Sequence, residues 1–167
     1  MTDTAPAPAT SPGRDRILDI VGLLARLVLG GVLLYAGLTK VTKPAASALA
    51  VQAYQIFPYE IGNYVGYALP IIEVILGAFI VAGLFTRLSA LLGTLLMVVF
   101  IAGIISAWTR GLSIDCGCFG GGGEIAPEET DYPRRIAEDV GFALAGVWLV
   151  VRPRSLASLD RIWFKTP

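Results

Sequence analysis

The segment Leu88–Trp108 reads LSALLGTLLMVVFIAGIISAW and contains no charged residue. A helix needs about 20 apolar residues to cross the hydrocarbon core of a bilayer, so this run predicts a transmembrane helix. The rest of the chain agrees, because 55% of its 167 residues are hydrophobic and only 16% are charged. A water-soluble domain usually carries about a quarter charged residues. We therefore expect a protein embedded in the lipid bilayer.

Three other segments resemble this run, and they cover residues 17–39, 64–85 and 133–151. Between the first two, Pro44 suits a first helical turn, and apolar residues up to Ile56 share one face, which predicts a short helix on the membrane surface. The sequence thus predicts an all-α fold, a four-helix transmembrane bundle with a short interfacial helix between helices 1 and 2. Tyrosines near that helix predict an aromatic belt at the interface: Tyr54, Tyr59, Tyr64 and Tyr67. Charged pairs at i,i+4 spacing predict a solvated first turn of the last span: Arg134 with Glu138 and Arg135 with Asp139.

The flanking segments complete the predicted organisation. Residues 1–13 are rich in Ala, Pro and Thr and predict a disordered tail, followed by a membrane domain over residues 14–152 and a second tail over residues 153–167. Cytoplasmic segments of membrane proteins carry an excess of Lys and Arg. The side that holds both termini is the richer in these residues, so we expect both tails in the cytoplasm. In the cytoplasmic (inner) membrane, the cysteine loop at residues 109–132 then faces outward.

Composition excludes several classes of function. Thirteen Lys and Arg balance thirteen Asp and Glu, so no basic excess favours a nucleic-acid partner. The chain has no histidine. This removes the Ser-His-Asp and Cys-His nucleophile systems, imidazole metal ligands and a histidine-ligated haem. We expect no intrinsic cofactor, and the chemistry must come from cysteines, carboxylates, Arg, Lys or Tyr.

Two ionisable residues lie deep in the predicted spans, Arg26 in the first and Glu73 in the second. A charge in hydrocarbon is costly and should face the bundle interior and find a partner. Both residues fall near mid-depth, so we predict an Arg26–Glu73 ion pair. Its role stays open between fixing the register of the two helices and forming a polar site for a proton or a quinone-like head group.

The loop before the last span contains both cysteines of the chain, Cys116 and Cys118, separated by Gly117. Residues two apart can approach a disulfide bond, although so small a ring is strained, and strained disulfides tend to be catalytic or regulatory. Several glycines predict a flexible backbone that another chain can approach. Three interpretations compete for the two cysteines: redox exchange with a partner, Cu(I) bound by two thiolates, and an inert structural turn.

Taken together, these residues resemble a known family. Arg26 and Gly30, the Gly37–Lys40 end of the first span, Tyr54–Pro58, and Leu69, Pro70 and Glu73 are similar to the DoxX family of four-helix membrane proteins. The Cys116–Gly120 loop resembles the MauE branch of that family. The resemblance covers roughly residues 20–150.

The resemblance implies a protein of membrane redox systems. MauE-like proteins are linked to disulfide formation in exported enzymes, so Cys116 and Cys118 are the expected catalytic pair. The expected partner is an extracytoplasmic thioredoxin-like or client protein, with a quinone as a possible electron acceptor. The alternative is a non-catalytic subunit that anchors a larger membrane oxidoreductase complex, in which the cysteines are dispensable.

Overall fold

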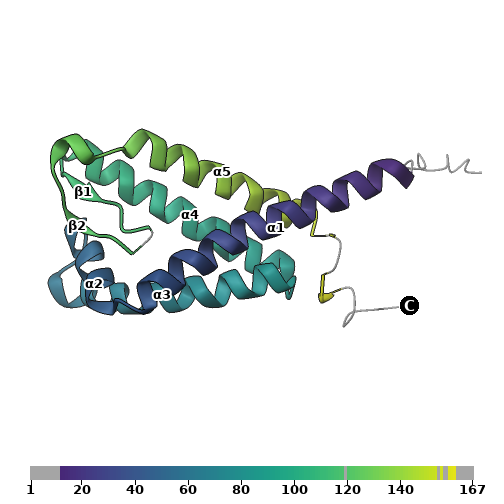
Figure 1. The fold of residues 1–167 in the computed structure, drawn as a ribbon, viewed down its shortest axis with the longest axis horizontal. Helices are drawn as coiled ribbons and strands as arrows, with labels where there is room; N and C mark the ends of the chain where they lie inside the picture. Colours follow the sequence, from purple (N-terminus) through teal and green to yellow (C-terminus); the bar gives the residue numbers. More distant parts are fainter. Residues whose placement is uncertain (1–11, 119, 154, 156–157, 161–167) are drawn as a thin grey trace, which may run out of the picture.

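The computed structural model describes residues 12–118, 120–153, 155 and 158–160. Within these residues the protein is mostly helical, as the sequence predicts (Figure 1). Its α-helices are α1 (Pro12–Val41), α2 (Pro44–Ala53), α3 (Tyr59–Ala82), α4 (Thr86–Thr109) and α5 (Tyr132–Val151). An antiparallel hairpin joins β1 (Ile114–Asp115) to β2 (Gly123–Glu124), and a single 3₁₀ turn, Pro127–Glu129, precedes α5.

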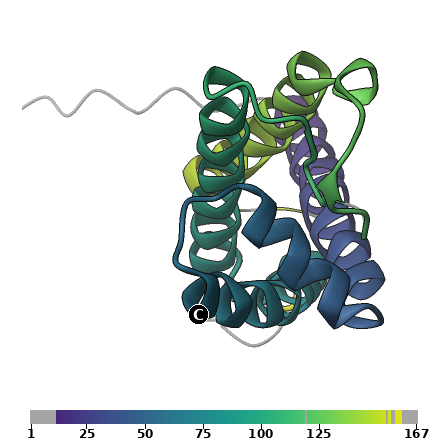
Figure 2. The same ribbon diagram turned by 90° about the vertical axis from the view of Figure 1, so that its left-hand side faces the viewer.

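The long helices pack in pairs, α1 against α3 and α4 against α5, and the pairs join through α1–α5 and α3–α4 contacts. The start of α1 and the end of α5 lie at one end of the molecule (Figure 1). The short helix α2 and the hairpin lie at the opposite end, where α2 crosses the ends of the longer helices (Figure 2). The core between the helices is aliphatic: Leu29, Leu33, Leu76, Ile80, Met97 and Leu149.

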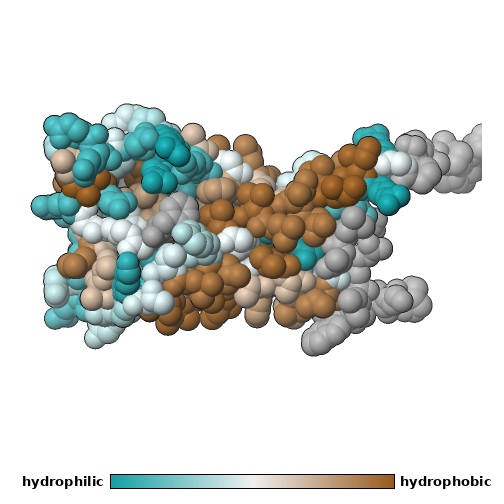
Figure 3. Space-filling model, in the orientation of Figure 1, coloured by the Kyte–Doolittle hydropathy of each residue, from teal (hydrophilic) through white to brown (hydrophobic). Residues whose placement is uncertain are grey.

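Three of the described helices are long and apolar enough to cross a membrane, namely α1, α3 and α4. Their outward faces carry exposed apolar side chains, which form a hydrophobic band over the middle of the molecule (Figure 3). The chain is therefore a multi-pass membrane protein. The helix α5 packs beside the other three but is less apolar, because Arg134, Arg135, Glu138 and Asp139 occupy its first two turns. A fourth crossing by α5 stays a prediction.

Glycines set the spacing between α1 and α3. A Cβ atom at Gly30 would lie 2.8 Å from a Val81 methyl, and one at Gly77 would lie 2.5 Å from the backbone nitrogen of Leu34. Only glycine, which has no Cβ atom, permits the backbones of α1 and α3 to approach this closely. Gly30 and Gly37 of α1 thus both lie at the contact with α3.

The position of α2 depends on a proline in α3. Pro70 has no N–H group, so the carbonyl oxygen of Gly66 lacks its usual helical partner. The Ser47 hydroxyl donates to this oxygen at 2.7 Å. A Cβ atom at Gly66 would lie 2.4 Å from the Ala48 Cα, so α2 lies directly on α3 at this point. The local defect in one helix is therefore the docking point of the next.

The two predicted tails fall mostly outside the described residues. At the N-terminus the description begins at Pro12, which already belongs to α1. Near the C-terminus, Asp160 accepts hydrogen bonds from the backbone N–H groups of Phe85 and Thr86, both at 2.8 Å. These N–H groups open α4 and have no partner within the helix, so Asp160 caps it from a distant part of the chain.

Candidate functional site

The hairpin places the two cysteines. Cys116 directly follows β1 and Cys118 lies in the connection to β2, whose tip is directed in among the helices (Figure 1). Tyr132, at the start of α5, fixes the base of the hairpin. Its hydroxyl accepts from the Ile114 N–H at 3.0 Å and donates to the Leu112 carbonyl at 2.6 Å. The site thus begins on an anchored segment.

The tip of the hairpin packs tightly on α2. A Cβ atom at Gly117 would lie 2.7 Å from the Ala50 Cβ, and one at Gly122 only 2.3 Å from it. Both glycines also have positive φ angles, 70° and 144°, which other residues rarely adopt. The Tyr54 hydroxyl donates to the Cys116 carbonyl at 3.0 Å. Gly117 and Gly122 therefore permit close packing against α2, a role that the sequence did not predict for them.

Both cysteines are free and half-buried. They line three adjoining hollows, which we name by position. The outer cleft is the widest of the three: the volume within which the centre of a water molecule can lie is about 220 Å³. It is lined by Ile114, Asp115, Cys116, Ile125, Glu129, Asp131, Tyr132 and Arg135. The middle pocket, of about 30 Å³, includes both cysteines, Lys40, Ser47, Tyr54 and Phe100. The inner cavity, of about 20 Å³, includes Cys118, Glu73, Arg135, Glu138 and Asp139.

The two thiols are therefore not equivalent. Cys116 faces the wide outer cleft and the middle pocket, whereas Cys118 faces the middle pocket and the inner cavity. A hydrogen bond from the Cys118 thiol lowers the pKa of Cys116, although burial and Asp115 act in the opposite direction. The same hydrogen bond, together with burial, raises the pKa of Cys118. Because the thiolate is the reactive form of a thiol, these opposite pKa shifts distinguish the two cysteines chemically.

The deep ion pair differs from the predicted one. The Lys40 Nζ lies 2.5 Å from the Glu73 Oε1, and both side chains are at least nine-tenths buried. Glu73 does not contact Arg26, so the predicted Arg26–Glu73 pair is wrong. The register of α1 against α3 explains this result: Arg26 bonds to the carbonyl of Val81, about two helical turns beyond Glu73.

Arg26 instead closes the end of α3. Its guanidinium donates to the carbonyls of Ile80 at 3.1 Å and Val81 at 2.6 Å, and to the Ser155 hydroxyl at 2.8 Å. The last carbonyls of a helix lack partners within it and carry partial negative charge, so a cation is favourable there. Arg26 is thus a buried cap at the end of the molecule opposite the cysteines.

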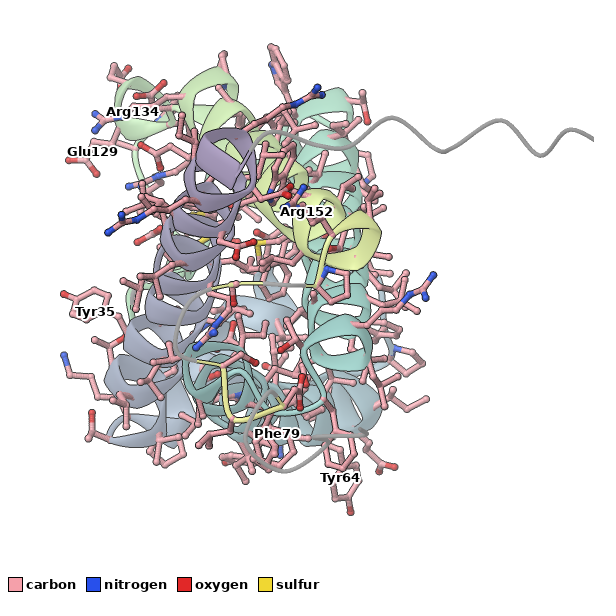
Figure 4. All side chains as sticks on the ribbon, turned by 90° about the vertical axis from the view of Figure 1, so that its right-hand side faces the viewer. Tyr35, Tyr64, Phe79, Glu129, Arg134 and Arg152 are labelled. Atoms are coloured by element: carbon pink, nitrogen blue, oxygen red, sulfur yellow. The ribbon has the colours of Figure 1, made fainter. Side chains whose placement is uncertain are left out.

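The first turns of α5 are divided between solvent and core. Glu138 binds both Arg134, at 2.9 Å, and Arg135, at 3.0 Å. The predicted Arg134–Glu138 pair is confirmed, whereas Arg135 does not pair with Asp139 as expected. Asp139 is only 7% exposed and lines the inner cavity. Figure 4 shows Arg134 and Glu129 at the periphery of the molecule, and Tyr35 and Tyr64 point outward from the helices.

Sequence reasoning missed four residues of this site: Lys40, Tyr54, Tyr132 and Asp139. Tyr54 belongs to a run of tyrosines that predicts an interfacial belt, yet its hydroxyl is turned inward to the hairpin. Lys40 lies at the end of a span, where a lysine usually extends to the interface. A signal was present in both cases, since each residue falls within the segments that resemble the DoxX pattern.

Comparison with known proteins gives one result. The family model described as "Methylamine utilisation protein MauE" matches residues 18–152, which include the hairpin and all but the first residues of the helical part. No curated protein and no solved structure matches the chain.

Proposed function

This chain belongs to the MauE family, and we propose that it is a membrane thiol-disulfide exchange protein that acts through Cys116 and Cys118. We place the hairpin on the outer side of the cytoplasmic membrane, with both termini in the cytoplasm and α5 as a fourth span. Its substrate class is a protein disulfide or dithiol in an exported or membrane protein, brought by a client or a thioredoxin-like partner. The kinship with DoxX-like proteins is part of this proposal.

The observation that carries the proposal is the unequal setting of the two thiols. Cys116 lines the wide outer cleft and has the lowered pKa, so it is the attacking thiolate. Cys118 lies behind it, hydrogen-bonded to it and screened from the cleft, so it is the resolving thiol. Exchange needs this order, because a partner must reach the first sulfur and the second must reach the resulting mixed disulfide.

The reaction of the dithiol form balances without a further oxidant. The Cys116 thiolate attacks one sulfur of the partner disulfide, which releases the partner's first thiolate and forms a mixed disulfide. The Cys118 thiolate then attacks the Cys116 sulfur and releases the second partner thiolate. The chain loses two electrons and becomes the Cys116–Cys118 disulfide, and the partner disulfide gains them. The reverse sequence oxidises a partner dithiol.

A quinone acceptor does not fit beside Cys118 in this arrangement. The volume within which the centre of a water molecule can lie is about 20 Å³ in the inner cavity and about 30 Å³ in the middle pocket. Each has room for one or two water molecules. A quinone ring is much larger. We therefore derive no step through a quinone.

The test uses a soluble aromatic disulfide, dithionitrobenzoate, whose coloured thiolate is counted as it is released. The wild-type protein should release two equivalents per chain and form its own disulfide. Cys118→Ser should release one equivalent and keep a stable mixed disulfide at Cys116. Cys116→Ser should react much more slowly. Equal rates and equal adducts for the two single variants would contradict the assignment of the attacking and resolving thiols.

The alternative of a non-catalytic anchor is separated by the double variant Cys116→Ser/Cys118→Ser. Loss of client disulfides at normal membrane abundance supports exchange, whereas unchanged activity of the host membrane system supports the anchor. A copper assay on the purified, reduced protein tests Cu(I) binding. Labelling by a membrane-impermeant maleimide from outside intact cells tests sidedness, and labelling only after the membrane is broken would overturn the proposed orientation.

A further inference from the structure

The inner cavity contains two buried carboxylates with unused oxygens. Glu73 is fully buried, and its Oε2 has no hydrogen-bond partner. Asp139 is 7% exposed, and its Oδ2 also has none. Buried polar atoms of native proteins normally have a partner, ordered water included. The cavity that these residues share with Cys118 has room for about one water molecule, which would reach such oxygens.

The charges around the cavity single out one of the carboxylates. From α3, Glu73 is bound to Lys40 of α1. On α5, Glu138 is bound to Arg135, and Arg135 lines both the inner cavity and the outer cleft. Among the described residues, Asp139 is the cavity carboxylate without an ion pair. Asp139 can therefore accept a proton without the loss of an ion pair.

The other elements around Cys118 offer no better acceptor. The helix α4 lines the inner cavity with Met97 and Phe100, which cannot take a proton. After α2, the hydroxyl of Tyr54 already donates to the Cys116 carbonyl, and burial raises its pKa. Cys116 is held in the mixed disulfide at the moment when Cys118 must ionise.

We propose that Asp139 is the proton acceptor for the Cys118 thiol, with the proton passing through water in the inner cavity. This inference rests on the proposed function, because it supplies the step that makes the resolving thiol reactive. Cys118 is the deeper thiol and the one whose ionisation burial opposes, so a nearby base is what this step requires.

The step balances as follows. The Cys118 S–H bond breaks, its proton moves to an Asp139 oxygen, and its electron pair stays on sulfur. This thiolate attacks the Cys116 sulfur of the mixed disulfide, the new Cys116–Cys118 bond forms, and the partner thiolate leaves. The net charge of the Cys118–Asp139 pair is unchanged by the proton transfer. In the reverse direction the Asp139 carboxyl returns the proton to Cys118.

A proton shared in this way gives a characteristic pH dependence. Between the two macroscopic ionisations of such a pair, a fixed fraction is in the thiolate–carboxyl form, so thiol reactivity hardly changes with pH. A thiol without an internal acceptor behaves differently. Its thiolate fraction rises about tenfold per pH unit until the pKa is reached.

The experiment uses Cys116→Ser protein in detergent, in which Cys118 is the remaining cysteine, and the small reagent methyl methanethiosulfonate. Mass spectrometry follows the modification rate from about pH 6 to pH 9, a range that contains the ordinary thiol pKa. We expect a rate that changes less than about threefold per pH unit. Adding Asp139→Asn should restore a change of about tenfold per unit. Adding Glu138→Gln, which alters the neighbouring carboxylate, should leave the profile flat.

Two results would overturn the inference. The first is a modification rate that changes tenfold per pH unit in Cys116→Ser itself. This result can be obtained even if the Asp139 variant does not fold. The second is a profile for Asp139→Asn that keeps the parent slope and moves only to lower pH, because Asp139 would then act as a nearby charge alone. No partner protein takes part in this assay. A flat profile combined with failed dithionitrobenzoate exchange would therefore refute the proposed function and leave the proton acceptor standing.

Discussion

The Lys40–Glu73 pair gives the sharpest prediction about stability. The two side chains are 5% and 0% exposed, and their charged atoms are 2.5 Å apart. The Lys40 ammonium also lies 5.7 Å from the centre of the Phe100 ring, within the range of a cation–π contact. Lys40→Met keeps the length of the side chain but removes its charge and its hydrogen bonds. It leaves the Glu73 carboxylate buried and without any partner.

The expected loss follows from desolvation. Removing one partner of a buried ion pair costs about 3–5 kcal/mol, because the remaining charge is uncompensated. For a protein of this size, 1 kcal/mol corresponds to about 2–4 °C in the unfolding midpoint, so Lys40→Met should lower it by about 6–20 °C. Adding Glu73→Gln removes the stranded charge. The double variant should therefore recover more than half of the loss.

Thermal unfolding in one mild detergent measures all the variants. The matched control is Lys43→Met, which changes an exposed lysine just beyond the end of α1 and should leave the midpoint nearly unchanged. Equal midpoints for Lys40→Met and Lys43→Met would refute the buried pair. Strictly additive losses in Lys40→Met/Glu73→Gln would also refute it, since a coupled pair must show an interaction energy.

Three further predictions concern packing, chemistry and capping. Gly77→Ala should lower the free energy of unfolding by about 1–3 kcal/mol or more, because its new Cβ would lie 2.5 Å from a backbone nitrogen of α1. In the control Gly31→Ala, the new Cβ meets nothing within 4 Å, so this variant should be tolerated. Thermal unfolding midpoints compare the two variants. Cys118→Ala should shift the alkylation midpoint of Cys116 to higher pH, because it removes the donor whose hydrogen bond lowers the pKa of Cys116. An unchanged midpoint in a pH series would contradict this. Asp160→Ala should destabilise the protein by about 1 kcal/mol through loss of the cap on α4, and an unaltered midpoint would show that this cap contributes nothing.

Local features were the most predictable from sequence. The apolar runs indicated a membrane protein, and Pro44 correctly marked the start of a short helix, because span length and first-turn geometry depend only on neighbouring residues. The glycine and serine details were less accessible. Gly117 packs against Ala50 of α2, and Ser47 binds the carbonyl that Pro70 leaves free. Both contacts join segments whose relative position is a property of the whole fold.

The family membership and the membrane setting could be inferred from the chain alone, since composition and motif spacing are properties of the sequence. Which charges meet was decided by the tertiary structure. Mid-depth counting placed Arg26 opposite Glu73, but close glycine contacts between α1 and α3 set a different register, in which Lys40 meets Glu73. The cavity that Cys118 and Asp139 both line has the same origin, because long-range packing depends on surface shape that no local pattern contains.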